Sequence, residues 1–446
     1  MYLIHKAHVV NEGRVYKASV CVKDDKIDAI FRDEVPQNIL DKSTVIDGED
    51  CWLMPGVIDD HVHFRDPGYP AKGDFESESR AAVAGGVTSV LDMPNTQPQT
   101  VSVADVEDKK AMASAKSHCN YGFYLGVTAD NQDELNRADY SGICGVKLFL
   151  GASTGGMQVD DPERLKRLFK ETPALIAVHA EDNAVIQRNL AQCKQEYGGL
   201  VPISCHSRIR SEQACFDASS KLVNLARTTG ARLHIMHLST AKELALLEDK
   251  PLADKKITAE ICPQYLTFCD ADYEALGARI KCNPAIKSAA DRDALRAALA
   301  TNKLDVIGTD HAPHALSDKN GTCLEAASGM PGIQFSLPLM LELAKKGVLS
   351  VEQVVEKMCH NPARLFGVQK RGFIRKGYQA DLVLVHRKFP WTLGADAVQS
   401  KCGWSPYEGQ SFSTKVLYTF VNGQVAFGPQ GVAGDVRGQA LTLGRG

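Results

Sequence analysis

Long hydrophobic runs are missing from this 446-residue chain. No apolar stretch reaches the roughly 18 residues that a membrane-spanning helix needs. Residues 1–6 lack the charged start and the apolar stretch of a secretion signal. An excess of basic charge is missing too, since 51 Lys and Arg stand against 54 Asp and Glu. This balance argues against a nucleic-acid binder or a protein held on a membrane by its charge. We expect a soluble, cytoplasmic protein.

Paired cysteine spacings are also absent. The 13 cysteines are odd in number and include no Cys-x-x-Cys pair. A zinc ribbon, a thioredoxin-type site or a disulfide framework would need pairs at set intervals. We therefore expect free thiols in a reducing compartment. The glycine-rich stretch 151–156 lacks the Gly-Lys-Ser/Thr ending of a phosphate-binding loop, so a flexible loop is expected there.

Short β-rich runs alternate with helical patterns between residues 54 and 368. Helices are expected over residues 76–84, which Gly85 and Gly86 end, and over 291–300. Eight strand–helix units in this length favour a (β/α)8 barrel of the TIM type, which is an α/β fold, over an open sheet. The expected strands are residues 56–61, 87–93, 121–127, 145–150, 174–179, 232–237, 257–262 and 305–309. In such a barrel the active site lies at the carboxyl ends of the strands.

Both ends of the chain are rich in strands instead. Near the C-terminus, residues 416–427 predict a hairpin around the turn Asn422-Gly423. Neither end holds enough apolar surface to fold well alone. We therefore expect residues 1–53 and 369–446 to form one small β-sandwich domain, and residues 54–368 to form the barrel. The other expected terminal strands are residues 18–22, 26–31, 44–47 and 380–385.

A His-x-His pair closes the first expected barrel strand. In an extended segment His61 and His63 face the same side, where two imidazoles can bind one metal ion. Lys147 lies inside an apolar run, where a bare ammonium would be costly. Carboxylation of its amine by carbon dioxide would give an anionic carbamate that is able to bridge two metal ions. The alternative is a lysine that extends to the barrel mouth or forms an ordinary ion pair.

Three further polar residues come at strand ends. His179 and His237 end the fifth and sixth expected strands, although either alone is compatible with an ordinary core histidine. His234 is set aside because, three residues from His237 in a strand, it faces the opposite side. Asp310 follows the eighth strand and is a candidate metal ligand and proton shuttle, with a helix cap as the alternative.

This ring of residues resembles the binuclear metal site of the amidohydrolase superfamily, and the resemblance covers nearly the whole chain. It implies two Zn²⁺ ions per subunit, bridged by carboxylated Lys147 and a hydroxide. The same ligand types also accept manganese or cobalt. The implied ligands of the first ion are His61, His63, the carbamate and Asp310, and those of the second are the carbamate, His179 and His237.

Neighbouring segments resemble motifs of the dihydroorotases within that superfamily. These segments are residues 61–68, 92–96, 282–284 and 310–314. The resemblance implies that Arg65, Asn95 and His314 bind a substrate carboxylate and that Asn283 contacts the dihydropyrimidine ring. A planar guanidinium suits bidentate carboxylate binding. An ion pair at the barrel mouth for Arg65 and a turn role for Asn95 remain alternatives, and Asn283 is ambiguous.

The resemblance predicts the reversible closure of N-carbamoyl-L-aspartate to L-dihydroorotate in pyrimidine synthesis, with Asp310 as the catalytic residue. The rival interpretation is an allantoinase or hydantoinase, because these share the metal site. They generally lack counterparts of Arg65 and Asn95. A catalytically silent scaffold relative is the third interpretation, disfavoured because all six metal-ligand positions are filled. A small-molecule substrate, no nucleic acid or membrane partner and a possible homodimer complete the expectation.

Overall fold

The computed structural model describes residues 1–151 and 156–444. The loop expected over 151–156 therefore lies largely outside the described residues. Within the described part, no helix combines the length and the apolar character needed to cross a bilayer.

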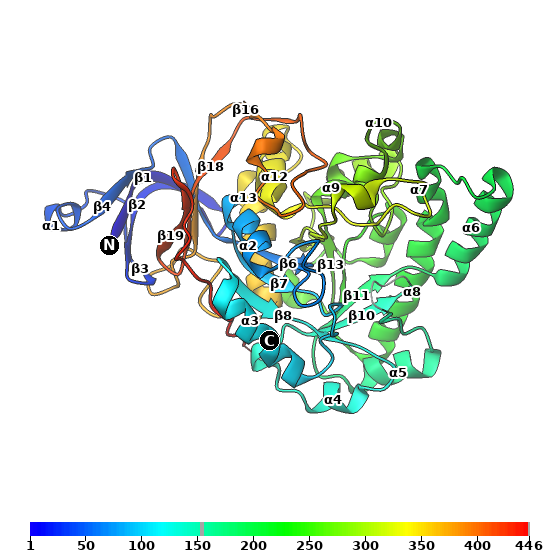
Figure 1. The fold of residues 1–446 in the computed structure, drawn as a ribbon. Coiled ribbons are helices and arrows are strands. Elements are labelled where there is room, and N and C mark those ends of the chain that lie inside the picture. The colour runs from blue at the N-terminus through cyan, green and yellow to red at the C-terminus, as the bar shows by residue number, and fades with distance from the viewer. Residues whose placement is uncertain (152–155, 445–446) are drawn as a thin grey trace.

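Parallel strands run through the centre of the larger part of the molecule (Figure 1). Each of the eight expected runs contains strand structure, and every residue of β6, β7, β10 and β11 is buried. Burial of both faces is typical of parallel strands covered by helices. The strands are β6 (Val57–Val62), β7 (Val87–Asp92), β8 (Asn120–Phe123), β9 (Leu125–Gly126), β10 (Val146–Leu150), β11 (Ile176–Ala180), β12 (Leu233–Ile235), β13 (Ile257–Ile261) and β14 (Val306–Ile307).

The expected strand over 121–127 is divided into β8 and β9. The N–H of Tyr124 donates to the carbonyl of Asp92 at the end of β7, whereas the N–H of Leu125 donates to the carbonyl of Gly145 before β10. The segment 121–127 therefore pairs first with β7 and then with β10. In this way it joins the sheet β6-β7-β8 to the sheet that holds β9 to β14. A parallel bridge between Val62 and His311 brings the end of the eighth unit back to the first strand. The expected (β/α)8-type architecture is confirmed.

Helices surround these strands. Helix α2 begins at a capping box, in which the carboxylate of Asp74 accepts from the Ser77 N–H and the Ser77 hydroxyl accepts from the Asp74 N–H. It ends before Gly85 and Gly86, where Gly86 adopts φ +88° as predicted for a helix stop. The helices are α2 (Phe75–Ala84), α3 (Val103–Lys116), α4 (Gln132–Arg137), α5 (Pro162–Glu171), α6 (Asn183–Tyr197), α7 (His206–Ile209), α8 (Glu212–Thr229), α9 (Pro263–Thr267), α10 (Tyr273–Leu276), α11 (Ala289–Ala298), α12 (Ser336–Lys345), α13 (Val351–Val355) and α14 (Asn361–Leu365).

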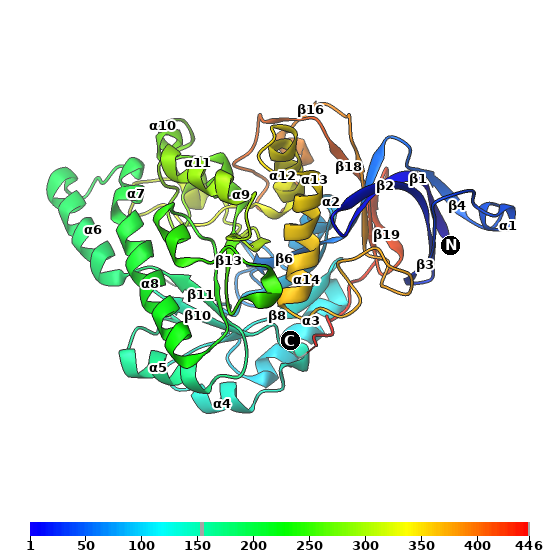
Figure 2. The ribbon, with the colours of Figure 1, turned by 180° about the vertical axis from the view of Figure 1, so that it is seen from behind.

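The two ends of the chain build one sheet together. Figure 2 shows the N-terminal strands in blue beside the C-terminal strands in red. Strand β5 lies between β1 of its own end and β15 of the other end. The predicted hairpin at Asn422-Gly423 is present between β18 and β19. The elements are β1 (Tyr2–Asn11), β2 (Arg14–Lys23), β3 (Lys26–Phe31), α1 (Gln37–Leu40), β4 (Thr44–Asp47), β5 (Cys51–Pro55), β15 (Leu382–His386), β18 (Lys415–Val421), β19 (Gln424–Gly428) and β20 (Gly431–Val432).

This terminal sheet folds over onto itself. Tyr2 of β1 packs edge-on against Phe420 of β18 at 5.5 Å between ring centroids, although β5 and β15 separate the two strands in the sheet order. A Cβ atom on Gly423 would meet the carbonyl of Asp24 at 1.9 Å, so the two hairpin turns touch. Glycine is required there because its φ of +78° also disfavours a side chain. The two layers enclose a shared apolar core, as a small sandwich does.

Two C-terminal segments leave this sheet and contact the barrel. The segment that holds β16 (Trp391–Thr392) and β17 (Ser411–Phe412) includes Trp404, whose indole N–H donates to the carbonyl of His314 at 2.9 Å. The N–H of Gly438 donates to the carbonyl of Ser117 at the end of α3.

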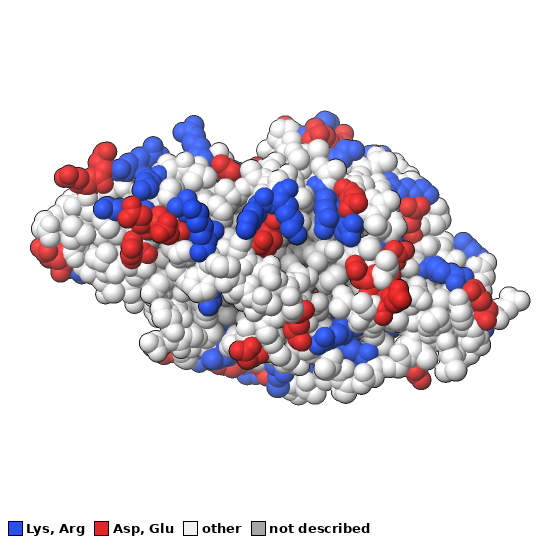
Figure 3. Space-filling model, turned by 90° about the horizontal axis from the view of Figure 1, so that it is seen from above, with Lys and Arg blue, Asp and Glu red and all other residues white. Residues whose placement is uncertain are grey.

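The division into two domains at residues 53/54 and 368/369 stays a proposal. On the face seen in Figure 3, basic and acidic side chains are interspersed, in keeping with the small net charge.

Candidate active site

The ten predicted site residues line one pocket at the carboxyl ends of the barrel strands. The pocket has a volume of about 340 Å³, within the roughly 300–1,000 Å³ range of small-molecule sites. Its lining residues are His61, His63, Arg65, Lys72, Asn95, Lys147, Phe149, His179, His237, Asn283, Asp310, Ala312, His314, Ala327, Ser328 and Gly329.

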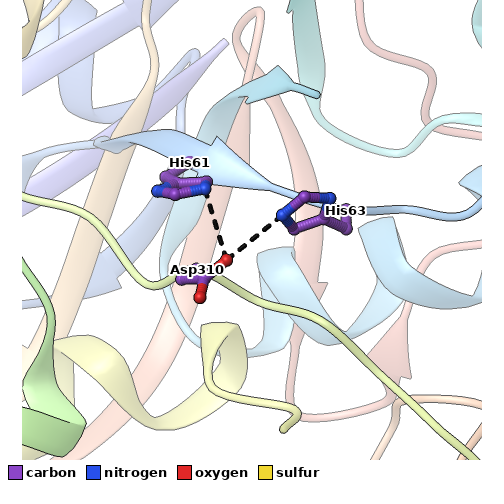
Figure 4. Close-up of side chains that lie close together, drawn as sticks. All are labelled: His61, His63 and Asp310. Atoms are coloured by element: carbon purple, nitrogen blue, oxygen red, sulfur yellow. Dashed lines mark hydrogen bonds and ion pairs between the residues drawn. The ribbon is translucent and has the colours of Figure 1, made fainter. Parts of the chain in front are cut away.

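The first cluster in the pocket joins β6 to the segment after β14 (Figure 4). Oδ1 of Asp310 lies 3.2 Å from Nε2 of His61 and 3.2 Å from Nε2 of His63. The three ligand atoms lie within 4.8 Å of one another. Both histidines therefore face the same side, as the His-x-His spacing predicts, and Asp310 faces the pocket rather than capping a helix.

The second cluster joins β11 to the segment after β12. Nδ1 of His179 lies 2.9 Å from Nε2 of His237. The His237 ring is 5.3 Å from the His61 ring, which places the two clusters side by side. His234 instead lies beneath the pocket, where its Nε2 is 3.2 Å from Asp60. The predicted opposite orientation of His234 and His237 is confirmed.

Two buried glutamates that the sequence analysis did not identify lie behind these histidines. Oε1 of Glu260 accepts from Nδ1 of His61 at 3.1 Å and from the backbone N–H of His237 at 2.9 Å. Oε2 of Glu181 accepts from Nε2 of His179 at 3.0 Å and also contacts Arg210. Such contacts fix which ring nitrogen is left to face the pocket. Both glutamates lie at strand ends, which is the signal that identified Asp310.

Lys147 projects from β10 into the same pocket and is completely buried. Its Nζ lies 2.8 Å from Sδ of Met236 and 5.0 Å from the centre of the Phe149 ring. Among the residues that the structure describes, its ammonium has no carboxylate within ion-pair distance. Burial lowers the pKa of Lys147 to about 8, although the charges of Glu260 and Asp310 oppose this shift. An amine with this pKa is about one-tenth neutral at pH 7, far more than an ordinary lysine, and the neutral form is the one that reacts with carbon dioxide.

Three residues of the site have a backbone conformation that is uncommon for side chains other than glycine. The φ angles of Arg65, His237 and Asp310 are +71°, +40° and +49°. Such conformations cost free energy and persist where the surrounding structure imposes them. They occur here where each chain segment leaves its strand and turns a functional side chain into the pocket.

The opposite wall of the pocket carries hydrogen-bond donors. Nη2 of Arg65 donates to Nε2 of His314 at 3.1 Å, and Nε of Arg65 donates to the carbonyl of Pro313. Since Nε2 of His314 accepts, its proton resides on Nδ1, which has no hydrogen-bond partner in the described structure. Oδ1 of Asn95 lies 2.9 Å from Nδ1 of His63, which leaves the amide Nδ2 available to a ligand.

Asn283 adds an acceptor to this wall. Its Oδ1 atom is buried and has no partner among the described residues. A buried amide oxygen without a partner costs free energy, which a donor on a ligand would recover. Arg65 is only 4% exposed, and no carboxylate lies within ion-pair distance of it in the described structure. The ordinary ion pair considered for Arg65 is therefore absent within residues 1–151 and 156–444.

Burial controls the charges in the pocket. It lowers the pKa values of His61, His63 and His237 well below the usual range, so these imidazoles are neutral near pH 7. Burial also lowers the pKa of Arg65 to about 10 and, together with the charge of Arg65, that of His314 to about 2. Neutral imidazoles carry lone pairs that can ligate a cation.

The donor set fits divalent metal ions. Imidazole nitrogens beside a carboxylate oxygen suit zinc and similar ions, and Nδ1 of His179 and Nε2 of His237 face each other in the same pocket. The buried Nδ1 of His237 has no hydrogen-bond partner in the described residues. The cluster of His61, His63 and Asp310 could therefore hold a metal ion.

Comparison with known proteins places this geometry in a family. The sequence profile of the Amidohydrolase family matches residues 52–426. The chain belongs to the amidohydrolase family. A dihydroorotase of Pyrococcus furiosus is 32% identical to it over 99% of this chain and 96% of its own. An allantoinase of Bacillus velezensis is 30% identical over 95% of this chain and 93% of its own.

The amidohydrolase fold is also supported by solved structures. The L-hydantoinase (dihydropyrimidinase) of Arthrobacter aurescens superposes with a TM-score of 0.92 at 29% identity, covering 99% of this chain and 100% of that one. The family resemblance seen in the sequence motifs is confirmed. Because relatives with different names are almost equally similar, the substrate must be argued from the pocket residues.

Proposed function

We propose that this amidohydrolase is a dihydroorotase, which interconverts N-carbamoyl-L-aspartate and L-dihydroorotate in pyrimidine synthesis. One observation carries the proposal: the buried Arg65 guanidinium has no carboxylate partner and faces the same pocket as the metal-ligand cluster. A cation in this position calls for an anionic group on the substrate. Allantoin and simple hydantoins offer no carboxylate there, whereas dihydroorotate does.

Three side chains would bind the substrate carboxylate. Arg65 presents its remaining guanidinium N–H groups, and charge-assisted bonds of this type are strong. Asn95 offers its amide Nδ2, because its Oδ1 faces His63. His314 offers Nδ1–H, because its Nε2 accepts from Arg65. The unpartnered Oδ1 of Asn283 would accept from a ring N–H. These four contacts orient the ring amide toward the histidine clusters.

The catalytic roles follow from the remaining residues. The proposed metal complement is two Zn²⁺ ions per subunit, held by His61, His63, His179, His237, Asp310 and the carbamate of Lys147. Two such cations polarise an amide carbonyl and acidify a water molecule. Asp310 would take the proton of the attacking water on a carboxylate oxygen and deliver it to the leaving ring nitrogen. In the metal-free chain, burial raises the pKa of Asp310, and the neighbouring His61 and Lys147 oppose this shift.

The decisive experiment measures turnover of L-dihydroorotate and allantoin side by side, on protein supplied with zinc and bicarbonate. Turnover of dihydroorotate with little of allantoin is expected. Turnover of allantoin alone would overturn the carboxylate assignment of Arg65, Asn95 and His314 while leaving the metal cluster in place. Zinc content per chain, measured by elemental analysis, tests the two-metal complement and also the alternative of a silent scaffold.

Location and assembly are part of the proposal. A reducing, cytoplasmic setting is supported by the 13 cysteines, which are all free thiols and, except for Cys402, buried. We also propose a small-molecule substrate, no nucleic-acid partner and a homodimer. Light scattering of the purified protein tests the last point.

A further inference from the structure

A second basic side chain lines the substrate wall of the pocket. Lys72 lies between β6 and α2, outside the motifs that identified the other residues, and it borders the same cavity as Arg65 and His314. We propose that Lys72 is a specificity-determining residue, which forms with Arg65 a paired-cation subsite for the substrate carboxylate. This inference rests on the proposed function.

The ammonium of Lys72 is available for a ligand. No hydrogen bond or ion pair to it occurs among the described residues. Its Nζ lies 5.5 Å from the centre of the Tyr69 ring, a cation–π contact that keeps the side chain over one side of the loop. A lysine that is only partly exposed and has no acidic partner is a natural site for an anion.

The backbone ties Lys72 to Arg65. The N–H of Lys72 donates to the carbonyl of Tyr69 at 2.9 Å, and the N–H of Tyr69 donates to the carbonyl of Arg65 at 3.1 Å. These two bonds form consecutive turns that return the chain to the pocket. A short, hydrogen-bonded loop therefore links the backbone positions of Arg65 and Lys72.

Neighbouring charges on this wall of the pocket shift the pKa of Lys72. Burial lowers its pKa, the Arg65 guanidinium lowers it further, and Asp318 opposes both. The charge of Lys72 in turn contributes to the lowered pKa of His314, after burial and Arg65. Arg65 and Lys72 are the cationic side chains on this wall of the pocket, and the nearby acid Asp318 lies 3.8 Å from Nδ1 of His314. An anionic ligand would relieve the repulsion between Arg65 and Lys72.

The chemistry of the substrate explains the need for a second cation. N-carbamoyl-L-aspartate carries two carboxylates, of which one enters the reaction and the other remains on the product ring. A single arginine would have to hold the spectator carboxylate against the repulsion of the reacting one. Lys72 would provide a second charge-assisted contact to the spectator carboxylate. A neutral ring without a carboxylate would gain no affinity from Lys72.

The test compares Lys72→Gln, Lys72→Arg and the control Lys116→Gln in the metal-loaded enzyme. Lys116 pairs with Asp66 at 2.8 Å, so the control removes a charge that touches the same loop outside the pocket. We expect Lys72→Gln to raise KM for dihydroorotate about tenfold with kcat nearly unchanged, as loss of one charge-assisted contact predicts. Lys72→Arg should restore most of the affinity, and Lys116→Gln should keep the wild-type KM.

Both directions of the reaction provide an internal check. An enzyme cannot change the equilibrium, so kcat/KM must fall by the same factor for N-carbamoyl-L-aspartate. An unchanged KM in Lys72→Gln, or an equal rise in Lys116→Gln, would overturn the subsite. If the wild-type enzyme did not turn over dihydroorotate at all, the proposed function itself would fail, which is a different result from an unaffected variant.

Discussion

Nδ1 of His179 lies 2.9 Å from Nε2 of His237, and both rings are buried in the pocket. Burial, followed by repulsion from His179 and His61, lowers the pKa of His237 well below its usual range. Nε2 of His179 is already engaged by Glu181, so its Nδ1, which faces Nε2 of His237, is the nitrogen left for a cation. We therefore expect metal binding to stabilise the folded chain strongly.

Removal of metal by a chelator should lower the melting temperature. At metal concentrations a thousandfold above Kd, the lost stabilisation amounts to about 4 kcal/mol, which calorimetry with and without zinc would measure. His237→Ala should bind less metal per chain, whereas the control His386→Gln, on β15 away from the pocket, should bind the wild-type amount. Equal melting temperatures of the metal-free and metal-loaded proteins would contradict the assignment.

Asp310→Asn separates metal binding from proton transfer. An amide oxygen can still face His61 and His63, so metal content should stay close to wild type, but the side chain can no longer accept a proton. We expect kcat to fall by roughly 10²–10⁴-fold, the usual range for loss of a general acid–base group. Steady-state kinetics and elemental analysis on the same sample provide the measurement. Near-normal turnover would remove Asp310 from its catalytic role.

The clustering of the strand-end residues in one pocket was predictable because the fold brings strand ends together. His179 and Asp310 are far apart in the sequence, yet both lie at the carboxyl ends of apolar strands, and these ends of the parallel strands in a barrel meet at one mouth. The alternating period of an extended chain correctly separated His237 from His234. The prediction of these strand-end residues needed no knowledge of the loops or of the side-chain packing.

Two features were not predictable by the same argument: the site residues in loops, and the points at which a strand changes the strand it pairs with. Lys72 lies in a polar loop whose path is set by hydrogen bonds to Tyr69, and no periodicity marks it. The break between β8 and β9 depends on which neighbour each N–H finds, which is a tertiary property. Glu260 could have been predicted as a site residue, because a carboxylate in the apolar run 257–262 shows the same signal as Asp310.

The buried ion pair between Lys109 and Asp92, beside the site, should contribute strongly to the free energy of unfolding. Nζ of Lys109 lies 2.5 Å from Oδ2 of Asp92, while Oδ1 of Asp92 accepts from the Phe64 N–H at 2.8 Å, between His63 and Arg65. Lys109→Met would leave the Asp92 charge buried and unpaired. We expect the free energy of unfolding to fall by about 3–5 kcal/mol, measured by denaturant titration.

A matched control lies one residue further along α3. Lys110 forms an exposed pair with Glu107 at 2.9 Å, and Lys110→Met should cost no more than about 1 kcal/mol. The double variant Asp92→Asn with Lys109→Met should recover part of the loss, because no unpaired charge remains buried. A loss in Lys109→Met as small as that in Lys110→Met would show that the buried pair contributes little.

Carboxylation of Lys147 should depend on pH in a defined direction. Only the neutral amine attacks carbon dioxide, and burial places the pKa of Lys147 at about 8. In metal-free protein supplied with bicarbonate, and after correction for dissolved carbon dioxide, the rate of carbamate formation should rise with pH and level off above about 8. Native mass spectrometry would detect the added carbon dioxide on one lysine, whereas the ion-paired Lys109 should remain unmodified.

Lys147→Ala should abolish both metal binding and turnover, because the proposed carbamate could no longer form while the space of the side chain remains. Short carboxylic acids such as acetate or propionate should restore part of both, since a free carboxylate can occupy the vacated space and face the two histidine clusters. Rescue that increases with the concentration of the acid and saturates would identify the missing group as a carboxylate. Full activity of wild-type protein whose intact mass shows no added carbon dioxide would refute the bridge, because the uncharged amine alone cannot supply two anionic oxygens.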